Sequence, residues 1–345
     1  MTDTTNTTNT TDTTDTTDTT DTTGATDATD ARIAAVPTPT PAASVGAAAG
    51  RRSARERGTR LLAALFLAPT VVGIVVFTVV PIIGSVVLSL FHWNVIDSPG
   101  FAGTANYREA FTDSTVLVSF RNTLVFMVFA VAAQLLIALS LALTLNGRMP
   151  TWLRSVFRSA FFFPLVLSAA SISVVMKYLF NQDFGVVNWL IGLIGIAPVP
   201  WLTSEHGAMA TVIIVYVWQQ FGFSFLLFVG GLNNIPKEIH EAASLDGATG
   251  LRKHLAITLP LLSPTLLVAS VVGIINALQV FEQPYVLTDG GPGDSTRTVV
   301  MVIYEKAFEQ LRFGEASAVG VLLFVLIMAV TAVQFRLSRR FVHYQ

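Results

Sequence analysis

Charged residues are missing from six long stretches of the chain, each of 18 to 31 residues. A helix rises about 1.5 Å per residue, so each stretch is long enough to cross the ~30 Å apolar core of a bilayer, with some snorkelling at its ends. We therefore predict an all-α membrane protein with six transmembrane helices. Their approximate bounds are 62–90, 122–146, 158–180, 208–234, 261–282 and 316–336.

A seventh uncharged stretch, residues 184–204, is interrupted by glycine and proline. The interruptions at Gly185, Gly192, Gly195, Pro198 and Pro200 leave a continuous helical part of about ten residues, which covers about 15 Å, half of a bilayer. We expect a short helix on the outer surface of the membrane. Its apolar contacts would be Val187, Leu190, Ile191 and Ile194.

Arginine and lysine predict the orientation of the chain in the membrane. If the chain starts in the cytoplasm and crosses six times, the inner segments from residue 51 onward hold 14 of these residues and the outer segments hold 6. Cytoplasmic segments of membrane proteins carry such an excess. Counting residues 184–204 as a span would reverse the topology of everything after it, against this bias. We predict that both termini are cytoplasmic and that the membrane is a bacterial or archaeal type of plasma (inner) membrane.

The composition supports a membrane protein with a different segment at its start. Apolar residues make up 52% of the 345 residues and charged residues 12%, against about 25% charge in a soluble domain. Residues 1–50 contain a Thr-Thr-Asp repeat followed by an Ala- and Pro-rich stretch and have no apolar face, so we expect a disordered tail. Residues 51–60 contain five arginines. They are interpreted as a basic juxtamembrane segment that contacts anionic lipid, with nucleic-acid binding as the weaker alternative.

A polar stretch, residues 236–260, separates the fourth and fifth predicted spans. Pro236 suits the first turn of a helix, and Glu238 and Glu241 suit the positive end of its dipole. Asp246-Gly247 then predicts a helix end, because glycine readily takes the left-handed cap conformation. A second helical piece follows, with an apolar stripe made of Leu251, Leu255 and Leu259. The pattern predicts a short helix and a bend outside the bilayer, in a position suited to docking.

This stretch resembles the EAA loop of ABC importer permeases. The matching groups are Glu241-Ala242-Ala243, Asp246-Gly247-Ala248 and Ile257-Thr258-Leu259-Pro260. The resemblance implies a type I ABC importer transmembrane domain over residues 61–340, with a coupling loop at 236–260. Its short helix would sit in a cleft of a cytosolic ATPase and carry the motion of that subunit into the membrane. The coupling residues so implied are Glu241, Ala242, Ala243, Asp246, Gly247, Ala248, Ile257, Leu259 and Pro260.

Further stretches are similar to the carbohydrate-uptake branch of this family, the MalF and UgpA type. They are residues 66–94, 105–111, 157–168, 217–243 and 287–296. This similarity implies a permease subunit for a sugar or related polar solute. The implied partners are a second homologous permease in a heterodimer, two ATPase subunits and an extracytoplasmic solute-binding protein.

The sequence gives no sign of catalysis or of a cofactor site in this chain. It lacks the G-x-x-x-x-G-K-[ST] pattern of a nucleotide-binding loop, so we expect ATP and Mg²⁺ to be used by the partner ATPase. The five histidines are scattered without metal-ligand spacing, and there is no cysteine. We therefore predict a transport subunit that is not an enzyme and binds no cofactor.

Amides and an aromatic residue within the spans are candidates for the substrate path. Asn276, Gln279 and Gln283 recur at spacings that place them on one helical face. Tyr216 and Gln220 show similar spacing in the fourth span. Amides hydrogen-bond hydroxyl groups and aromatic rings stack on sugars, so both sets suit a sugar path. Alternatively, these residues hold helices together, which is the favoured role for Gln134.

An ion-coupled secondary transporter of small polar solutes is the alternative function. Such a protein needs ionisable groups near the middle of the bilayer to bind the coupling ion. The six uncharged stretches contain none, and Glu282 lies just past the edge of the fifth. This absence favours the ATP-driven importer.

Overall fold

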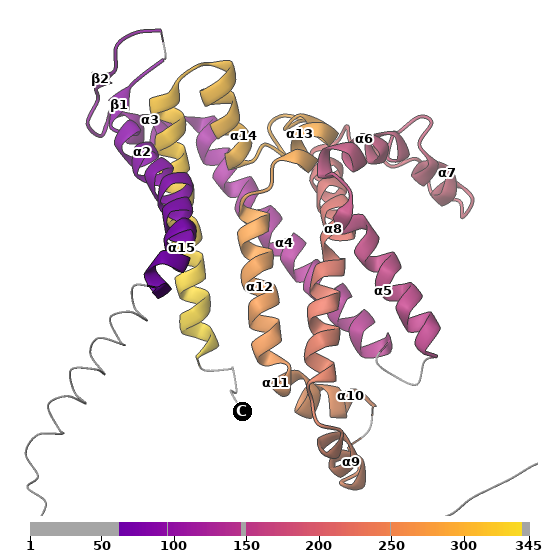
Figure 1. Cartoon of the computed structure of the whole chain (residues 1–345). Coiled ribbons are helices and arrows are strands. Elements are labelled where there is room, and N and C mark those ends of the chain that lie inside the picture. Colours follow the sequence, from indigo (N-terminus) through magenta and orange to yellow (C-terminus); the bar gives the residue numbers. More distant parts are fainter. Residues whose placement is uncertain (1–61, 95, 146–149, 249, 340–345) are drawn as a thin grey trace, which may run out of the picture. The chain divides into compact units, whose positions relative to one another are not determined.

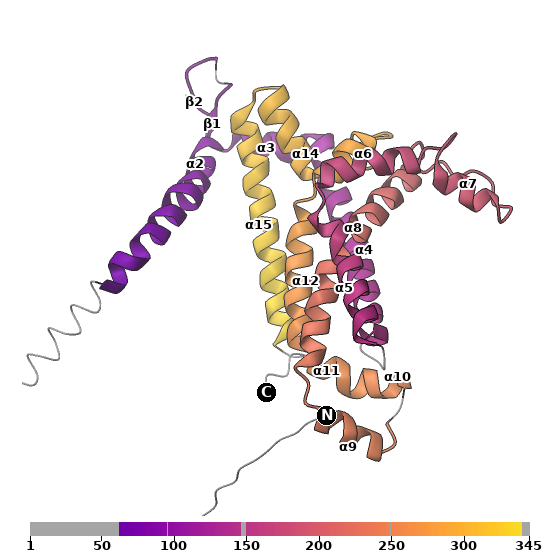
Figure 2. The same cartoon turned by 45° about the vertical axis from the view of Figure 1, so that its right-hand side comes forward.

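Helices make up nearly all of the regular structure in the computed structural model of this protein, shown in Figure 1 and, turned by 45°, in Figure 2. The structure describes residues 62–94, 96–145, 150–248 and 250–339. The predicted tail (1–50) and basic segment (51–60) lie outside these residues. The chain divides into a unit that ends at Ala68 and a unit that begins at Pro69. The helix packing lies within the second unit.

Four helices in the described part of the chain are long and apolar enough to cross a membrane. They are Leu62–Leu88, α4 (Ser114–Leu145), α8 (Glu205–Asn233) and α15 (Phe313–Ser338). Two further pairs of helices pass the same test together, each bent at a short break, so the spans number six if each bent pair counts as one. The predicted fold class, an all-α membrane protein with six spans, is confirmed in this form.

The first bent pair consists of α5 (Thr151–Val166) and α6 (Ala169–Leu179), which meet at an angle of 100°. Pro164 lies in the last turn of α5 and has no N–H to donate. Leu167 then takes an extended conformation, with φ −75° and ψ 143°, and the helix ends. The bend falls inside the predicted span 158–180, which the sequence presents as one uninterrupted stretch.

The second bent pair brings the chain back towards the membrane after the polar stretch. A π-helical turn, η2 (His254–Thr258), and α11 (Leu259–Leu261) lead into α12 (Ser263–Leu278) through a bend of 67°. Pro260 and Pro264 flank this bend, and neither can donate a backbone hydrogen bond. After α12 the chain breaks again and continues as α13 (Glu282–Thr288). The predicted span 261–282 therefore covers α12 and the break that follows it.

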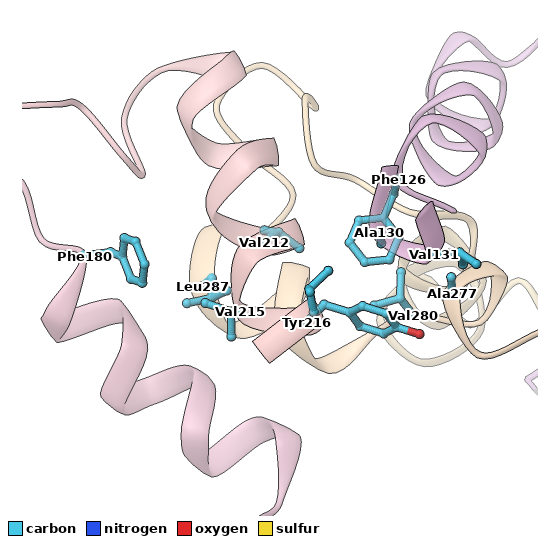
Figure 3. Close-up of a cluster of buried hydrophobic side chains, with 11 residues drawn as sticks. Phe126, Ala130, Val131, Phe180, Val212, Val215, Tyr216, Ala277, Val280 and Leu287 are labelled. Carbon is cyan, nitrogen blue, oxygen red and sulfur yellow. The ribbon is translucent and has the colours of Figure 1, made fainter. Parts of the chain in front are cut away.

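The helix α8 is the centre of the packing, because it contacts α4, α5, α12 and α13. Its approach to α5 is close: a Cβ atom on Gly222 would lie 1.9 Å from the Phe161 carbonyl oxygen. Towards one end of α8, Tyr216 packs against Phe126 of α4, with ring centroids 5.0 Å apart. Figure 3 shows this cluster, in which Val280 also packs. Side chains of four separate helical segments thus share one core around α8.

The remaining elements are two parts of the first span and the short elements that lie between the spans. They are η1 (Val75–Val79) and α2 (Val80–Leu88) of the first span, β1 (Phe91–His92), β2 (Gly100–Phe101), α3 (Ala105–Thr112), α7 (Val186–Gly192), α14 (Val299–Tyr304) and η3 (Glu305–Glu309). The short helix predicted within residues 184–204 is present as α7. Asn188 fixes it by donating to the carbonyls of Gln182 and Val199 and accepting from the Trp201 indole. Its place on the membrane surface stays a prediction.

A buried cation joins three segments at the end of the bundle where α6 and α13 lie. The Lys306 Nζ atom is 3.1 Å from Asp113 and 3.0 Å from Glu315, and the lysine side chain is only 8% exposed. Asp113 lies between α3 and α4, Lys306 in η3, and Glu315 in the first turn of α15. The ion pairs therefore tie the start of α4 to the start of α15.

The charges of this network shift the pKa values of its members. Burial by itself would lower the pKa of Lys306, but hydrogen bonds to Glu315 and Asp113 outweigh it and raise that pKa above the ordinary 10.5. Burial would likewise raise the pKa of Asp113, yet the bonds from Lys306 and the Thr115 backbone hold it below 3.8. The network stabilises the fold between these limits. It weakens as pH falls through the lowered pKa of Asp113 or rises through the raised pKa of Lys306.

Replacing Lys306→Met tests this network. It leaves two partly buried carboxylates without their cation, so we expect the free energy of unfolding to fall by about 3 kcal/mol, measured by thermal unfolding in detergent at neutral pH. Arg312→Met is the matched control, because Arg312 also contacts Glu315, at 3.5 Å, but its side chain is 53% exposed. Its loss should cost less than about 1 kcal/mol. Equal effects of the two substitutions would refute a dominant role for Lys306.

Candidate coupling site and translocation path

The helix α9 (Lys237–Leu245) ends in the way that the sequence predicts. Asp246 is the cap, and Gly247 follows in the left-handed region with φ +75°. The Gly247 N–H donates to the Ser244 carbonyl at 3.3 Å, and the Ala248 N–H donates to the Ala243 carbonyl at 2.9 Å. These two bonds form a Schellman motif, which satisfies carbonyl groups that the helix end leaves free. The Glu-Ala-Ala group thus lies in the last turns of the helix, and the Asp-Gly-Ala group supplies the cap residue and the N–H groups that close it.

Most of the predicted coupling residues on α9 are open to solvent. Glu241, Ala242, Asp246 and Gly247 are exposed, whereas Ala243 is buried. In both Figure 1 and Figure 2, α9 lies beyond the ends of α8 and α12, away from α6 and α13. The helix therefore projects from the bundle with its acidic residue uncovered.

Leu245 is a further surface residue of α9 that the sequence analysis does not select. Its side chain is 90% exposed. It lies four residues after Glu241, and residues at this spacing share one helical face. This spacing is the sequence signal that could identify Leu245, because it places an acidic and an apolar residue on one face of a short helix.

The second helical piece predicted before Pro260 is present as α10 (Gly250–Lys253), η2 and α11. In η2 the Leu259 N–H donates to the His254 carbonyl, one residue further back than in an α-helix. Ile257, Leu259 and Pro260 are half-buried. These residues lie where the chain re-enters the helix bundle. They are therefore less open to solvent than the exposed residues on α9.

The two helices that flank the coupling loop meet at Gly231 of α8. A Cβ atom there would lie 2.5 Å from Thr265 Oγ1 and 2.7 Å from a methyl carbon of Leu262. A Cβ atom on the neighbouring Gly230 would meet nothing within 4 Å. The absence of a side chain at Gly231 therefore allows the close contact between the end of α8 and the start of α12.

Two of the predicted path residues lie on an open part of α12. Asn276 and Gln279 are exposed, and Gln279 caps the helix with φ −104° and ψ 14°. The predicted common face does not extend to Gln283, because α12 ends at Leu278. Gln283 lies in α13, is 2% exposed, and donates from Nε2 to Gln219 Oε1 at 2.8 Å.

The candidates on α8 are more enclosed. Tyr216 is 2% exposed, and its hydroxyl has no hydrogen-bond partner among the described residues. Gln220 is half-buried. Gln134 of α4, for which a packing role is predicted, donates from Nε2 to Ser224 Oγ of α8 at 2.8 Å. The described conformation thus leaves Asn276 and Gln279 as the open polar groups of the set.

Comparison with known proteins identifies the family. The model of the family described as "binding-protein-dependent transport system inner membrane component" matches residues 134–343. The chain is 34% identical over 286 residues to the sulfoquinovosyl glycerol transport system permease protein SmoG of Agrobacterium fabrum, covering 82% of this chain and 92% of that relative. It is 32% identical over 277 residues to the trehalose/maltose transport system permease protein MalF of Thermococcus litoralis, covering 80% and 92%.

A solved structure has the same fold. It is the crystal structure of a bacterial ABC transporter involved in the import of the acidic polysaccharide alginate. The match has a TM-score of 0.73 and 23% identity, over 84% of this chain and 99% of that chain. The resemblance to ABC importer permeases is confirmed. This chain belongs to the family of binding-protein-dependent transport system inner membrane components, as a permease subunit of an ABC importer.

Proposed function

We propose that this permease imports a sugar or related polar solute and forms one half of the translocation path, the other half being a second homologous permease chain. The names of the relatives support a sugar: besides SmoG and MalF, a relative at 33% identity over 281 residues is the lactose transport system permease protein LacF of Rhizobium radiobacter. A solved structure of the same fold is an alginate transporter in complex with its pentasaccharide-bound periplasmic protein. The solute would reach this permease on an extracytoplasmic binding protein.

The observation that carries the coupling role is the exposed face of α9. Glu241 and Leu245 lie on a helix that projects from the bundle and is closed by its own Schellman motif. The motif satisfies carbonyl groups at the tip of the helix without a bond from the bundle, so the tip can fill a cleft in another protein. We place it in a cytosolic ATPase, two copies of which use ATP and Mg²⁺, while this chain binds no cofactor. ATPase closure would then move α8 and α12 together.

The arginine and lysine bias supports the orientation that this role needs. With 14 of these residues in the inner segments from residue 51 onward and 6 in the outer segments, α9 and both termini face the cytoplasm. The end of the bundle that carries α6 and α13 then faces outward, towards the solute-binding protein.

For the path itself, the open amides of α12 are the leading candidates. Asn276 and Gln279 can donate to and accept from sugar hydroxyl groups because their side chains are exposed. Gln220 is half-buried and could join them, whereas Tyr216 and Gln283 are buried in the described conformation. A change of conformation would be needed to bring those two to the solute.

Reversing the charge at Glu241 tests the coupling site. Glu241→Lys should abolish ATP-driven uptake while the protein stays in the membrane, because an exposed side chain contributes little to the fold. Uptake of labelled solute and the amount of permease in the membrane fraction are the measurements. Glu241→Gln separates loss of the charge from its reversal and should be less harmful. Normal uptake by Glu241→Lys would remove the docking role.

Shortening the path amides tests the substrate contact. Asn276→Ala and Gln279→Ala should change the apparent affinity of uptake or the ratio of uptake rates for two competing sugars. Gln334→Ala is the control, because Gln334 is also an amide within a span but donates to Ser270 Oγ at 2.6 Å, between α15 and α12. It should leave selectivity unchanged. If the two α12 variants match this control, their amides do not line the path.

Adjacent glycines test the contact between α8 and α12. Gly231→Ala must displace Thr265 or Leu262, so we expect uptake per ATP hydrolysed to fall severalfold in the assembled importer. Gly230→Ala adds the same methyl group one residue away, where a Cβ atom meets nothing within 4 Å, and should behave as the unsubstituted protein. Equal coupling in both variants would show that this contact does not transmit the motion.

A further inference from the structure

Two short helices cap the end of the bundle opposite α9, and each continues a broken span. The helix α6 follows α5 after the bend at Leu167, and α13 follows α12 after the break beyond Leu278. The two caps pack against each other, and Lys177 Nζ of α6 donates to the Val286 carbonyl of α13 at 3.2 Å. In Figure 1 and Figure 2 both lie beside the upper part of α8.

A single side chain of α8 bonds to both of these broken segments. Gln219 donates from Nε2 to the Leu167 carbonyl at 3.0 Å, which is the point where α5 ends. Its Oε1 atom accepts from Gln283 Nε2 at 2.8 Å, in the first turn of α13. Both glutamines are almost completely buried, at 3% and 2% exposure.

The chemistry of the amide fits this position. A carboxamide offers a donor on one side and an acceptor on the other, so it can satisfy a free carbonyl and an N–H donor at once. A carboxylate in its place would repel the Leu167 carbonyl, and an ammonium would lack the acceptor. Hydrogen bonds between helices in membranes are individually weak. Such bonds hold an arrangement but can break and re-form during a transport cycle.

The backbone of α8 connects this amide to the coupling loop without a break. From Gln219 to the end of the helix at Asn233 is a continuous run of about 21 Å. Only Asn234, Ile235 and Pro236 separate that end from α9. A displacement of α9 would therefore reach Gln219 through the continuous helix α8, which packs against α4, α5, α12 and α13.

We propose that Gln219 is a positioning residue that latches the α6–α13 caps to α8, so that both broken spans move with the helix that leads to the coupling loop. The proposal rests on the function proposed above. It adds a specific element by which motion at α9 reaches the opposite end of the permease. Loss of the amide frees the caps from α8 and lets ATP hydrolysis proceed without import.

Two readouts in the assembled importer in lipid nanodiscs and proteoliposomes test the latch. The chain has no cysteine, so Val175→Cys in α6 and Gly230→Cys in α8 give two exposed label sites for electron paramagnetic resonance distance measurement. Solute imported per ATP hydrolysed is measured separately, without labels. Gln219→Ala should broaden the α6–α8 distance distribution and lower import per ATP at least about threefold. Gln334→Ala, which removes an amide bond elsewhere in the spans, should change neither.

Gln283 supplies a second variant and a check on the shared bond. Gln283→Ala should act in the same direction as Gln219→Ala but more weakly, since the bond to Leu167 remains. Adding Gln283→Ala to Gln219→Ala should change little, because the bond is already lost. Unchanged coupling in Gln219→Ala would overturn the proposal, whether or not the distances broaden, because broadening alone is a structural effect. Failure of the proposed function is distinct: the unsubstituted importer would then not import sugar with ATP.

Discussion

The apolar interior of a membrane offers no hydrogen-bond partners to the backbone, and this constraint shapes each interruption in the spans. A helix that breaks there must satisfy the backbone groups that it frees. At the end of α5 the Leu167 carbonyl is satisfied by the Gln219 side chain. Before Pro81 and Pro260 the helix widens into the π turns η1 and η2, in which the preceding N–H reaches a carbonyl five residues back. The breaks are therefore compensated features of the fold.

This constraint explains why α8 is central. It is the uninterrupted helix that contacts α4, α5, α12 and α13, and it supplies the glutamine that the broken helices need. At its other end, Gly231 admits the start of α12, and six residues after Gly231 the chain enters α9. The permease thus combines a stiff element through its middle with broken elements at one end and a projecting helix at the other.

The sequence predicts the class of fold and the helix α9 well because the physical signals are local. Absence of charge marks the spans, and Asp246-Gly247 marks the end of α9 through the conformational freedom of glycine. The predicted span begins at residue 122, after the charge of Arg121, whereas the helix α4 begins earlier, at Ser114. A charged residue ends an apolar stretch without ending a helix.

The breaks and the buried amides could not be predicted from the sequence because they depend on contacts between distant residues. Pro164 alone does not fix a bend at Leu167, since membrane helices tolerate proline where neighbours satisfy the freed groups. The bond from Gln219 to Leu167 spans 52 residues of sequence. The spacing of Gln283 relative to Asn276 assumed one continuous helix, and the break after Leu278 turns Gln283 towards α8 instead. Side-chain spacing predicts a shared face only as far as the helix is unbroken.

The central claim is that an external motor drives this permease through α9, and the energy source of transport tests it most directly. Proteoliposomes that hold the permease with its partner permease, ATPase and binding protein should accumulate solute only when ATP is hydrolysed. Vesicles that hold the permease alone should not accumulate solute on a proton or sodium gradient. Accumulation by the permease alone on an ion gradient, with no ATPase present, would contradict the account.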